Sequence, residues 1–164
     1  MQLKRLPCRG WVLLEALFAL ALLGLGMWAA LTMTQMGLYT QRQQLARETA
    51  MGLAQDLSQR MQLNATQLSA YAQRWGQGAS VASNDCQQSP CTAAQLAQWD
   101  VQMWRARLAH DLPSGDATVF ASDPGWWGIV LAWRDERETL RTDTTHGTPP
   151  CPAQSSCWRL WVHP

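Results

Sequence analysis

One carboxylate and four cysteines are the residues of this chain whose type and spacing could do chemistry. Glu15 is the only charged residue in the run from Trp11 to Leu31, and every other residue of that run is apolar or glycine. Inside a bilayer a carboxylate costs about 2.5–3.5 kcal/mol on insertion scales, so it usually has a partner or a task. Because the neighbouring side chains supply no cation, the partner that Glu15 needs must come from outside this stretch of chain.

The cysteines predict disulfides. Cys8 stands alone near the N-terminus, and the other four form two close pairs. An even number of cysteines in an exported domain is typical of disulfide bonding. Three connectivities are possible, and we favour the local pairs Cys86–Cys91 and Cys151–Cys157 over the pairings that would tie the mid-chain loop to the C-terminal loop. The rival is a zinc site, since the four and five intervening residues approach the spacing of zinc ligands, but in an exported domain we expect no metal.

The remaining reactive side chains lack the constellation of an enzyme. His110, His146 and His163 do not have the spacing of a metal site or a catalytic triad. No serine lies in a nucleophile-elbow context, and no glycine-rich phosphate loop is present. The acidic run 135–138 is most simply a solvated turn or strand end. We therefore expect no catalysis and no cofactor.

Ten tryptophans are the other unusual feature. Trp99, Trp104 and Trp133 fall on predicted buried faces, so we expect them in the core. Trp126 and Trp127 are neighbours on a predicted strand, where successive side chains point to opposite faces. One of them should therefore face outward, where it could mark a subunit contact.

The apolar run Trp11–Leu31 is long enough to span a membrane, because an apolar helix of about 20 residues crosses a bilayer. The basic residues Lys4, Arg5 and Arg9 precede the run, and the next basic residue, Arg42, lies well beyond it. The N-terminus is therefore predicted to be cytoplasmic. A cleaved secretory signal peptide and a plain signal anchor are the alternatives. The end of the run fits a signal-peptidase site poorly.

Length and charge limit the rest of the molecule. A chain of 164 residues has room for one domain with an anchor. Its net charge is +1 and only 15% of its residues are charged, while 47% are hydrophobic. This balance argues against a protein that binds nucleic acid through a broad basic face, so we do not expect nucleic acid as a partner.

The helical pattern continues beyond the apolar run as an amphipathic half. Residues 32–63 contain no proline, and apolar residues recur on one face at steps of three and four: Ala46, Ala50, Leu53, Leu57 and Met61. We therefore predict one helix from Trp11 to about Leu63, with Gly24 and Gly26 as its weak points.

Residues 64–164 are predicted to form a globular head. A variable stretch, 64–91, leads to a second helix that Thr92 and Gln95 begin with a capping box and Leu112-Pro113 ends. We expect the buried side of this helix to hold Leu96, Trp99, Met103, Trp104 and Leu108. Strand candidates follow at 117–121, 125–133 and 158–162, and 135–141 continues or turns the second. The fold class is α+β, with a long N-terminal helix, transmembrane and then amphipathic, packed on a small head with a second helix and an antiparallel sheet of about three strands.

Gly10 and the five residues after it, Trp-Val-Leu-Leu-Glu, resemble the cleavage motif of type IV prepilins. The resemblance includes a short basic leader, residues 1–10, and the long apolar helix. It implies that a prepilin peptidase cuts after Gly10 and methylates the new N-terminus at Trp11, where this family more often has Phe. It also implies that Glu15 pairs with the free amine of a neighbouring subunit, which would supply the missing cation.

The middle of the chain resembles PilV proteins, a class of minor pilins. The similar residues are Asp85-Cys86, Cys91, Gln95-Leu96-Ala97, Asp100, Trp104 and Leu112-Pro113. This resemblance implies a single-pass inner-membrane protein with a periplasmic head, lipid around residues 11–31, and a place in a priming or tip complex of a type IV pilus. Its partners would be other minor pilins, the major pilin and a large tip adhesin. The alternatives are a minor pseudopilin of a type II secretion system and a tip-located module that contacts a surface or DNA.

Overall fold

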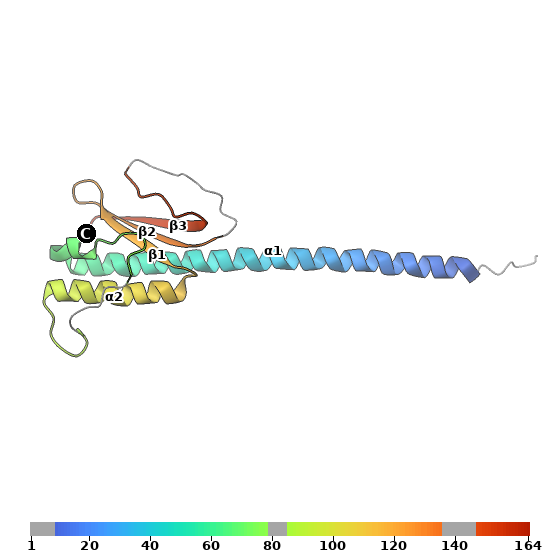
Figure 1. The fold of residues 1–164 in the computed structure, drawn as a ribbon, viewed down its shortest axis with the longest axis horizontal. Coiled ribbons are helices and arrows are strands. Elements are labelled where there is room, and N and C mark those ends of the chain that lie inside the picture. The colour runs from blue at the N-terminus through green and yellow to red at the C-terminus, as the bar shows by residue number, and fades with distance from the viewer. Residues whose placement is uncertain (1–8, 79–84, 136–146) are drawn as a thin grey trace, which may run out of the picture. The chain divides into compact units, whose positions relative to one another are not determined.

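The computed structural model describes residues 9–78, 85–135 and 147–164. The chain divides into two compact units, Met1–Arg42 and Gln43–Pro164, and one helix, α1 (Arg9–Leu63), belongs to both. Figure 1 shows the ribbon, in which α1 is followed by a short 3₁₀ helix, a second helix and three strands. The predicted α+β fold class is confirmed.

In its described residues, the first unit consists of the N-terminal part of α1. The helix begins at Arg9, two residues before the predicted start. Every side chain from Trp11 to Leu38 is exposed. The hydroxyls of three threonines donate to carbonyl oxygens three or four residues earlier, which gives these polar groups a partner within the helix: Thr32, Thr34 and Thr40.

The second unit is built on the remainder of α1. The predicted apolar face is confirmed, with Ala50, Leu53, Leu57 and Met61 at 3% exposure or less. Ala54 is also fully buried on this face. Its small side chain, with that of Ala50, lets the neighbouring elements approach the helix closely.

The two long helices are joined by a short element, and the sequence analysis did not predict this element. η1 (Ala65–Tyr71) is a 3₁₀ helix, and its last residue, Tyr71, is fully buried. The chain then continues in an extended form, and Gln73 exchanges two backbone hydrogen bonds of 2.9 Å with Val119. Part of the predicted variable stretch therefore packs on the head as ordered structure.

The second long helix, α2 (Ala93–Asp111), begins at the predicted capping box. Thr92 Oγ1 accepts a hydrogen bond of 3.3 Å from the Gln95 N–H, and Gln95 Oε1 accepts one of 2.9 Å from the Thr92 N–H. The turn after α2 passes close to the end of the helix. An added Cβ at Gly115 would lie only 2.4 Å from the Leu108 carbonyl oxygen, so this turn needs glycine.

The predicted buried side of α2 is partly wrong. Leu96 and Met103 are 38% and 40% exposed, and Trp99 is half-buried. The buried positions are instead Ala97, Asp100, Val101, Trp104, Arg105 and Leu108. The buried face of α2 differs from the predicted one because Asp100 and Arg105 have bonding partners inside the head. The sequence analysis left these charged side chains off the buried face, because unpaired charges are expected at the surface.

Three antiparallel strands form one sheet in the order β1–β2–β3, with the bounds β1 (Asp116–Ala121), β2 (Trp127–Arg134) and β3 (Ser155–Val162). They overlap the three predicted strands: β1 begins one residue earlier, β2 begins two residues later and ends one residue later, and β3 begins three residues earlier. In the centre of the sheet Ile129 pairs with Val119 on one side and Leu160 on the other. The continuation predicted over 135–141 lies, apart from Asp135, outside the described residues, as does His146.

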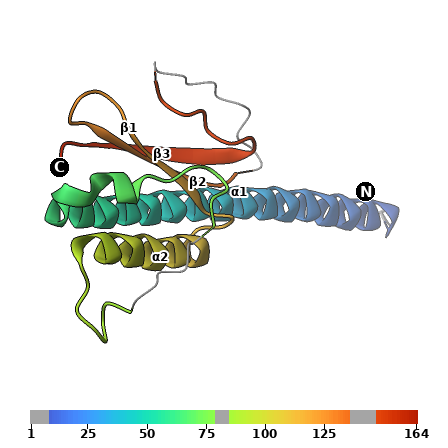
Figure 2. The same cartoon turned by 60° about the vertical axis from the view of Figure 1, so that its left-hand side comes forward.

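In the second unit α2 and the sheet both pack on α1 (Figure 2). From α2, Trp104 Nε1 donates to the Leu53 carbonyl oxygen at 2.8 Å. From β2, Trp133 Nε1 donates to Gln43 Oε1 at 2.9 Å. The predicted packing of the amphipathic half on a small head is confirmed, and the core lies where these elements meet.

Candidate functional site

The exposed part of α1 is the first candidate site, because no other part of the described chain covers its apolar surface. Trp11 and Trp28 are 72% and 74% exposed, and the leucines between them are 52–70% exposed. Among the described helices, α1 from Trp11 onward is the one long and apolar enough to cross a membrane, by length and composition. A helix surface of this kind is stable inside a bilayer or against other helices.

The predicted chemistry of this helix centres on Glu15. Trp11 and Glu15 lie four positions apart in α1, which places them on one face. In the described part of the chain the Glu15 carboxylate has no ion pair. Residues 1–8, including Cys8, lie outside the described residues. Cleavage after Gly10, methylation of Trp11 and pairing of Glu15 therefore stay predictions.

A polar junction joins the end of α1 to η1 and α2. Asp100 accepts hydrogen bonds from Arg60 Nη1 at 2.5 Å and from the Tyr71 hydroxyl at 2.9 Å. Burial raises the pKa of Tyr71 to about 12; the hydrogen bond from Asn64 acts against this shift and the Asp100 carboxylate adds to it. Asn64 also donates to the Ala93 carbonyl oxygen at 2.8 Å, so the junction fixes where α2 starts.

Arg105 is a second buried polar centre, and the sequence analysis missed it. Its guanidinium makes four hydrogen bonds of 2.8–3.2 Å, to Gln73 Oε1, Asp116 Oδ1 and the carbonyl oxygens of Arg74 and Ala117. A buried cation is tolerated only when such partners are in place. The signal that could have revealed it is its position between Trp104 and Leu108 on the apolar side of α2.

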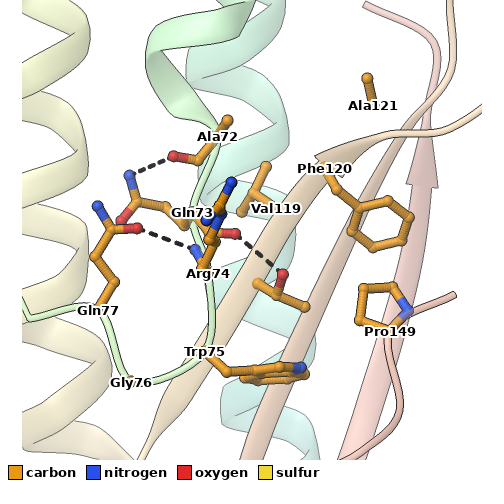
Figure 3. A pocket seen from close by; sticks show the side chains of 11 residues that line it. Ala72, Gln73, Arg74, Trp75, Gly76, Gln77, Val119, Phe120, Ala121 and Pro149 are labelled. Atoms are coloured by element: carbon orange, nitrogen blue, oxygen red, sulfur yellow. Dashed lines mark hydrogen bonds between the residues drawn. The ribbon is translucent and has the colours of Figure 1, made fainter.

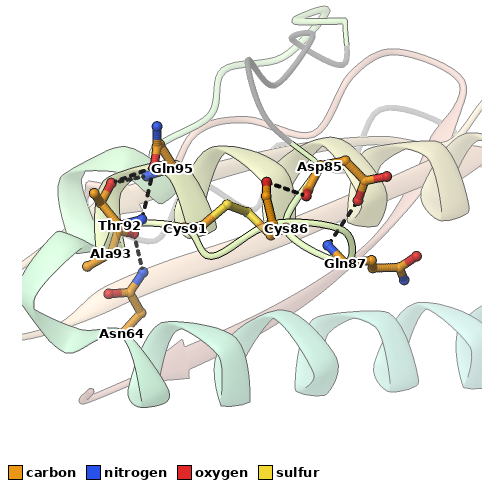
Figure 4. The surroundings of a disulfide bond; sticks show 9 residues. Asn64, Asp85, Cys86, Gln87, Cys91, Thr92, Ala93 and Gln95 are labelled. Carbon is orange, nitrogen blue, oxygen red and sulfur yellow. Dashed lines mark hydrogen bonds between the residues drawn. A yellow bond between two sulfur atoms is a disulfide. The ribbon is translucent and has the colours of Figure 1, made fainter.

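Figure 4 shows the Cys86–Cys91 disulfide directly before α2. The two Cα atoms are 5.5 Å apart, and Cys91 immediately precedes the N-cap residue Thr92. The Asp85 carboxylate, just before this small ring, accepts a hydrogen bond of 2.9 Å from the N–H of Gln87, which lies within the ring. The ring restricts the chain that leads into the capping box.

The second disulfide, Cys151–Cys157, ties the segment before β3 to β3 itself, with the Cα atoms 6.2 Å apart. Both disulfides are the local pairs favoured from the sequence, and the crossed pairings do not form. Within the described residues, no group of three or more His, Cys, Asp or Glu side chains could hold a metal ion.

An open cleft of about 830 Å³ lies beside β1 (Figure 3). Its walls come from residues 72–77 after η1, residues 118–121 of β1 and Pro149. Figure 3 shows the rings of Trp75, Phe120 and Pro149 around it. The sequence analysis did not predict this cleft, because its walls come from three segments that lie far apart in the sequence.

The tryptophan predictions hold in part. Trp104 and Trp133 are buried, at 0% and 3% exposure, but Trp99 is half-buried, so the prediction for Trp99 is wrong. Trp126 is 44% exposed, and Trp127 is half-buried against the core. One of the two neighbours therefore faces outward, and its role as a subunit contact stays a prediction.

Comparison with known proteins gives one match. Residues 33–102 match the family model described as Tt1218-like, type IV pilin Tt1218. This match supports a type IV pilin. It covers less than half of the chain, from the end of the exposed part of α1 to the middle of α2. No curated protein and no solved structure matches the chain.

The match agrees with the geometry of α1. A membrane-anchored pilin carries a long apolar helix near its N-terminus, and α1 fits that description. Type IV pilins are structural proteins that work with other components of a pilus, so the match favours a structural role in pilus assembly over an enzymatic one.

Proposed function

We propose that this chain is a minor pilin, similar to PilV proteins, which takes part in initiating and assembling a type IV pilus within a priming or tip complex. The observation that carries the proposal is α1, in which an exposed apolar part holding Glu15 continues into the segment that matches the pilin family. A subunit with this much uncovered apolar helix depends on lipid before assembly and on other helices after it.

The proposed processing follows from the motif at Gly10. A prepilin peptidase cuts after this residue on the cytoplasmic side of the inner membrane and methylates the amine of Trp11. The Glu15 carboxylate then lies about one helical turn from the new N-terminus. On assembly it pairs with the amine of a neighbouring subunit, and the desolvated carboxylate gains the cation that its own helix lacks.

The similarity to PilV proteins is supported by what the shared residues do in the head. Cys86 and Cys91 form the disulfide before α2, Asp100 accepts two hydrogen bonds in the polar junction, and Trp104 bonds to α1. In the proposed arrangement the head lies in the periplasm, residues 11–31 lie in the inner membrane, and the partners are other minor pilins, the major pilin and a tip adhesin.

Intact mass and N-terminal sequencing of the protein from cells with and without prepilin peptidase test the processing. We expect a chain that starts at methylated Trp11 only in cells that have the peptidase. The variant Gly10→Val should stay uncut, while the matched Gly24→Val should be cut normally. A chain that still starts at Met1 in cells with the peptidase would overturn the proposal.

The assembly step has its own test. We expect Glu15→Ala to be cleaved but to be missing from sheared pili, whereas Glu48→Ala, an exposed acid on the same helix, should enter them normally. Normal amounts of Glu15→Ala in the sheared pili would contradict the pairing. Recovery of the wild-type chain with a type II secretion apparatus instead of with pili would favour the pseudopilin alternative.

A further inference from the structure

The cleft beside β1 has the size and the lining of a small-molecule site. Its volume is about 830 Å³, and ligand pockets usually measure about 300–1,000 Å³, with aromatic walls and a few polar groups. Three of its lining residues carry rings: Trp75, Phe120 and Pro149 (Figure 3). Because these rings come from three separate segments, the cleft exists only in the folded head.

The walls of this cleft are held by contacts within the head. Gln73 and Val119 exchange two backbone hydrogen bonds of 2.9 Å, and Thr118 Oγ1 donates to the Gln73 carbonyl oxygen at 3.0 Å. The Phe120 ring meets the Trp161 ring edge to face, with the centroids 5.8 Å apart. A site that is formed before the ligand arrives loses little conformational entropy on binding.

Arg74 sets the charge of the cleft. It is exposed, and among the described residues of the lining it is the only charged one; its guanidinium has no acidic partner in the described part of the chain. Arg105 differs, since it is buried and bonded to Asp116. A guanidinium without a partner, in a lining that also holds aromatic rings, suits a ligand that joins a carboxylate to an apolar ring face.

Two other ligand classes fit this cleft less well. An extended peptide would add to the edge of β1 as a further strand, but Gln73 already occupies the edge-facing N–H and C=O of Val119. Single-stranded nucleic acid is bound in grooves with several cations along the backbone, and among its described residues the lining offers Arg74 alone.

We infer that the cleft binds an acidic saccharide, a sugar ring that carries a carboxylate. The C–H face of the sugar packs against the rings of Trp75 and Phe120, and the carboxylate pairs with the Arg74 guanidinium. The inference concerns the second unit alone and does not depend on the proposed pilin function.

Calorimetric titration of the full chain, in a detergent without a sugar headgroup, tests this inference. The probes are trigalacturonic acid and the neutral galactose trisaccharide with the same linkage, which differ in the carboxylates. We expect the acidic probe to bind the wild type about tenfold more tightly, and Arg74→Gln to remove this preference while keeping the weaker binding of the neutral probe. Trp75→Ala should abolish binding of both probes.

Matched variants separate the cleft from general effects. Arg107→Gln changes another exposed arginine of the head, and Trp28→Ala removes an exposed tryptophan that lies outside the cleft, so both should bind like the wild type. Near-ultraviolet circular dichroism confirms that each variant is folded. Equal binding of both probes, no binding of either, or affinities that Arg74→Gln and Trp75→Ala leave unchanged would overturn the inference. Tighter binding of oligothymidylate that depends on Arg74 would overturn the saccharide class.

Discussion

The two parts of α1 share one secondary structure and have opposite surroundings. From Trp11 to Leu38 every side chain is exposed, whereas beyond Gln43 the helix has a face in which Leu57 and Met61 are fully buried. The helix itself forms in both parts, because its backbone bonds are local. What differs is that the second part finds its packing partners within the chain.

This difference separates helix formation from helix stability. A long helix gains most of its stability in proteins from packing an apolar face rather than from intrinsic propensity. The second part of α1 obtains that packing from α2 and the sheet. The first part has no such cover among the described residues, and in the proposed pilin lipid and other subunits supply it.

The largest expected difference between the two parts comes from removing one charge in each. Arg105→Met should lower the free energy of unfolding of the second unit by about 3–5 kcal/mol, because Asp116 and two carbonyl oxygens lose a buried cation. Glu15→Gln should leave that free energy unchanged. Urea unfolding of the full chain in micelles, followed by near-ultraviolet circular dichroism, measures both, and a loss below about 1 kcal/mol in Arg105→Met would contradict the buried role.

A pair of leucines makes the same comparison with apolar side chains. Leu57→Ala should cost about 2–5 kcal/mol, because Leu57 has 0% exposure and leaves a cavity in the core. Leu25→Ala, at a position 68% exposed, should change the unfolding of the second unit by less than about 0.5 kcal/mol. Equal losses in the same urea experiment would show that the first part of α1 packs on the head.

Alkaline pH should weaken the second unit through the polar junction. The pKa of Tyr71 is raised from 10.0 to about 12, so between these values the unfolded chain releases the phenol proton first. The stabilisation is fully present below pH 10 and is lost as the pH rises towards 12. Urea unfolding at a series of pH values measures how the free energy of unfolding of the second unit falls as the pH rises. If this free energy falls equally in Tyr71→Phe, the loss belongs to other groups.

The smallest expected effect comes from two glycines. At Gly52 and Gly24 nothing lies within 4 Å of an added Cβ, so alanine fits at both positions. Gly52→Ala should raise the free energy of unfolding of the second unit by about 0.5–1 kcal/mol, and Gly24→Ala should leave it unchanged. If the free energy of unfolding of the purified protein is lower in Gly52→Ala than in the wild type, another group packs closely on that position.

The sequence predicted those elements whose signals are local. The spacing of Ala46, Ala50, Leu53, Leu57 and Met61 gave the buried face of α1, and the pair Thr92 and Gln95 gave the start of α2. The processing motif is local too, since it lies in the few residues from Gly10 to Glu15, and it stays a prediction. Such patterns involve only neighbours in the sequence, so one sequence is enough to read them.

The features that the sequence did not predict depend on distant partners. Arg105 is buried because Asp116 and the backbone after η1 surround it, and its own helix gives no sign of them. The face of α2 was misplaced for the same reason, and η1 was missed because Tyr71 is anchored by Asp100. The cleft beside β1 also needs the fold, since Trp75 and Pro149 are far apart in the sequence and line it together only in the folded head.

The local pairing of the cysteines has a mechanical consequence. The disulfides join residues only 5 and 6 positions apart, so neither links α1 covalently to the sheet or to α2. A pulling force along α1 is therefore resisted in the second unit by non-covalent contacts such as the bonds from Trp104 to Leu53 and from Trp133 to Gln43. Once these contacts break, the chain can extend almost fully, because the two disulfide-closed loops contain only about 40 Å of chain length at about 3.6 Å per residue. Under tension the strength of this head lies in its packing, and reducing agents should change its final extension very little.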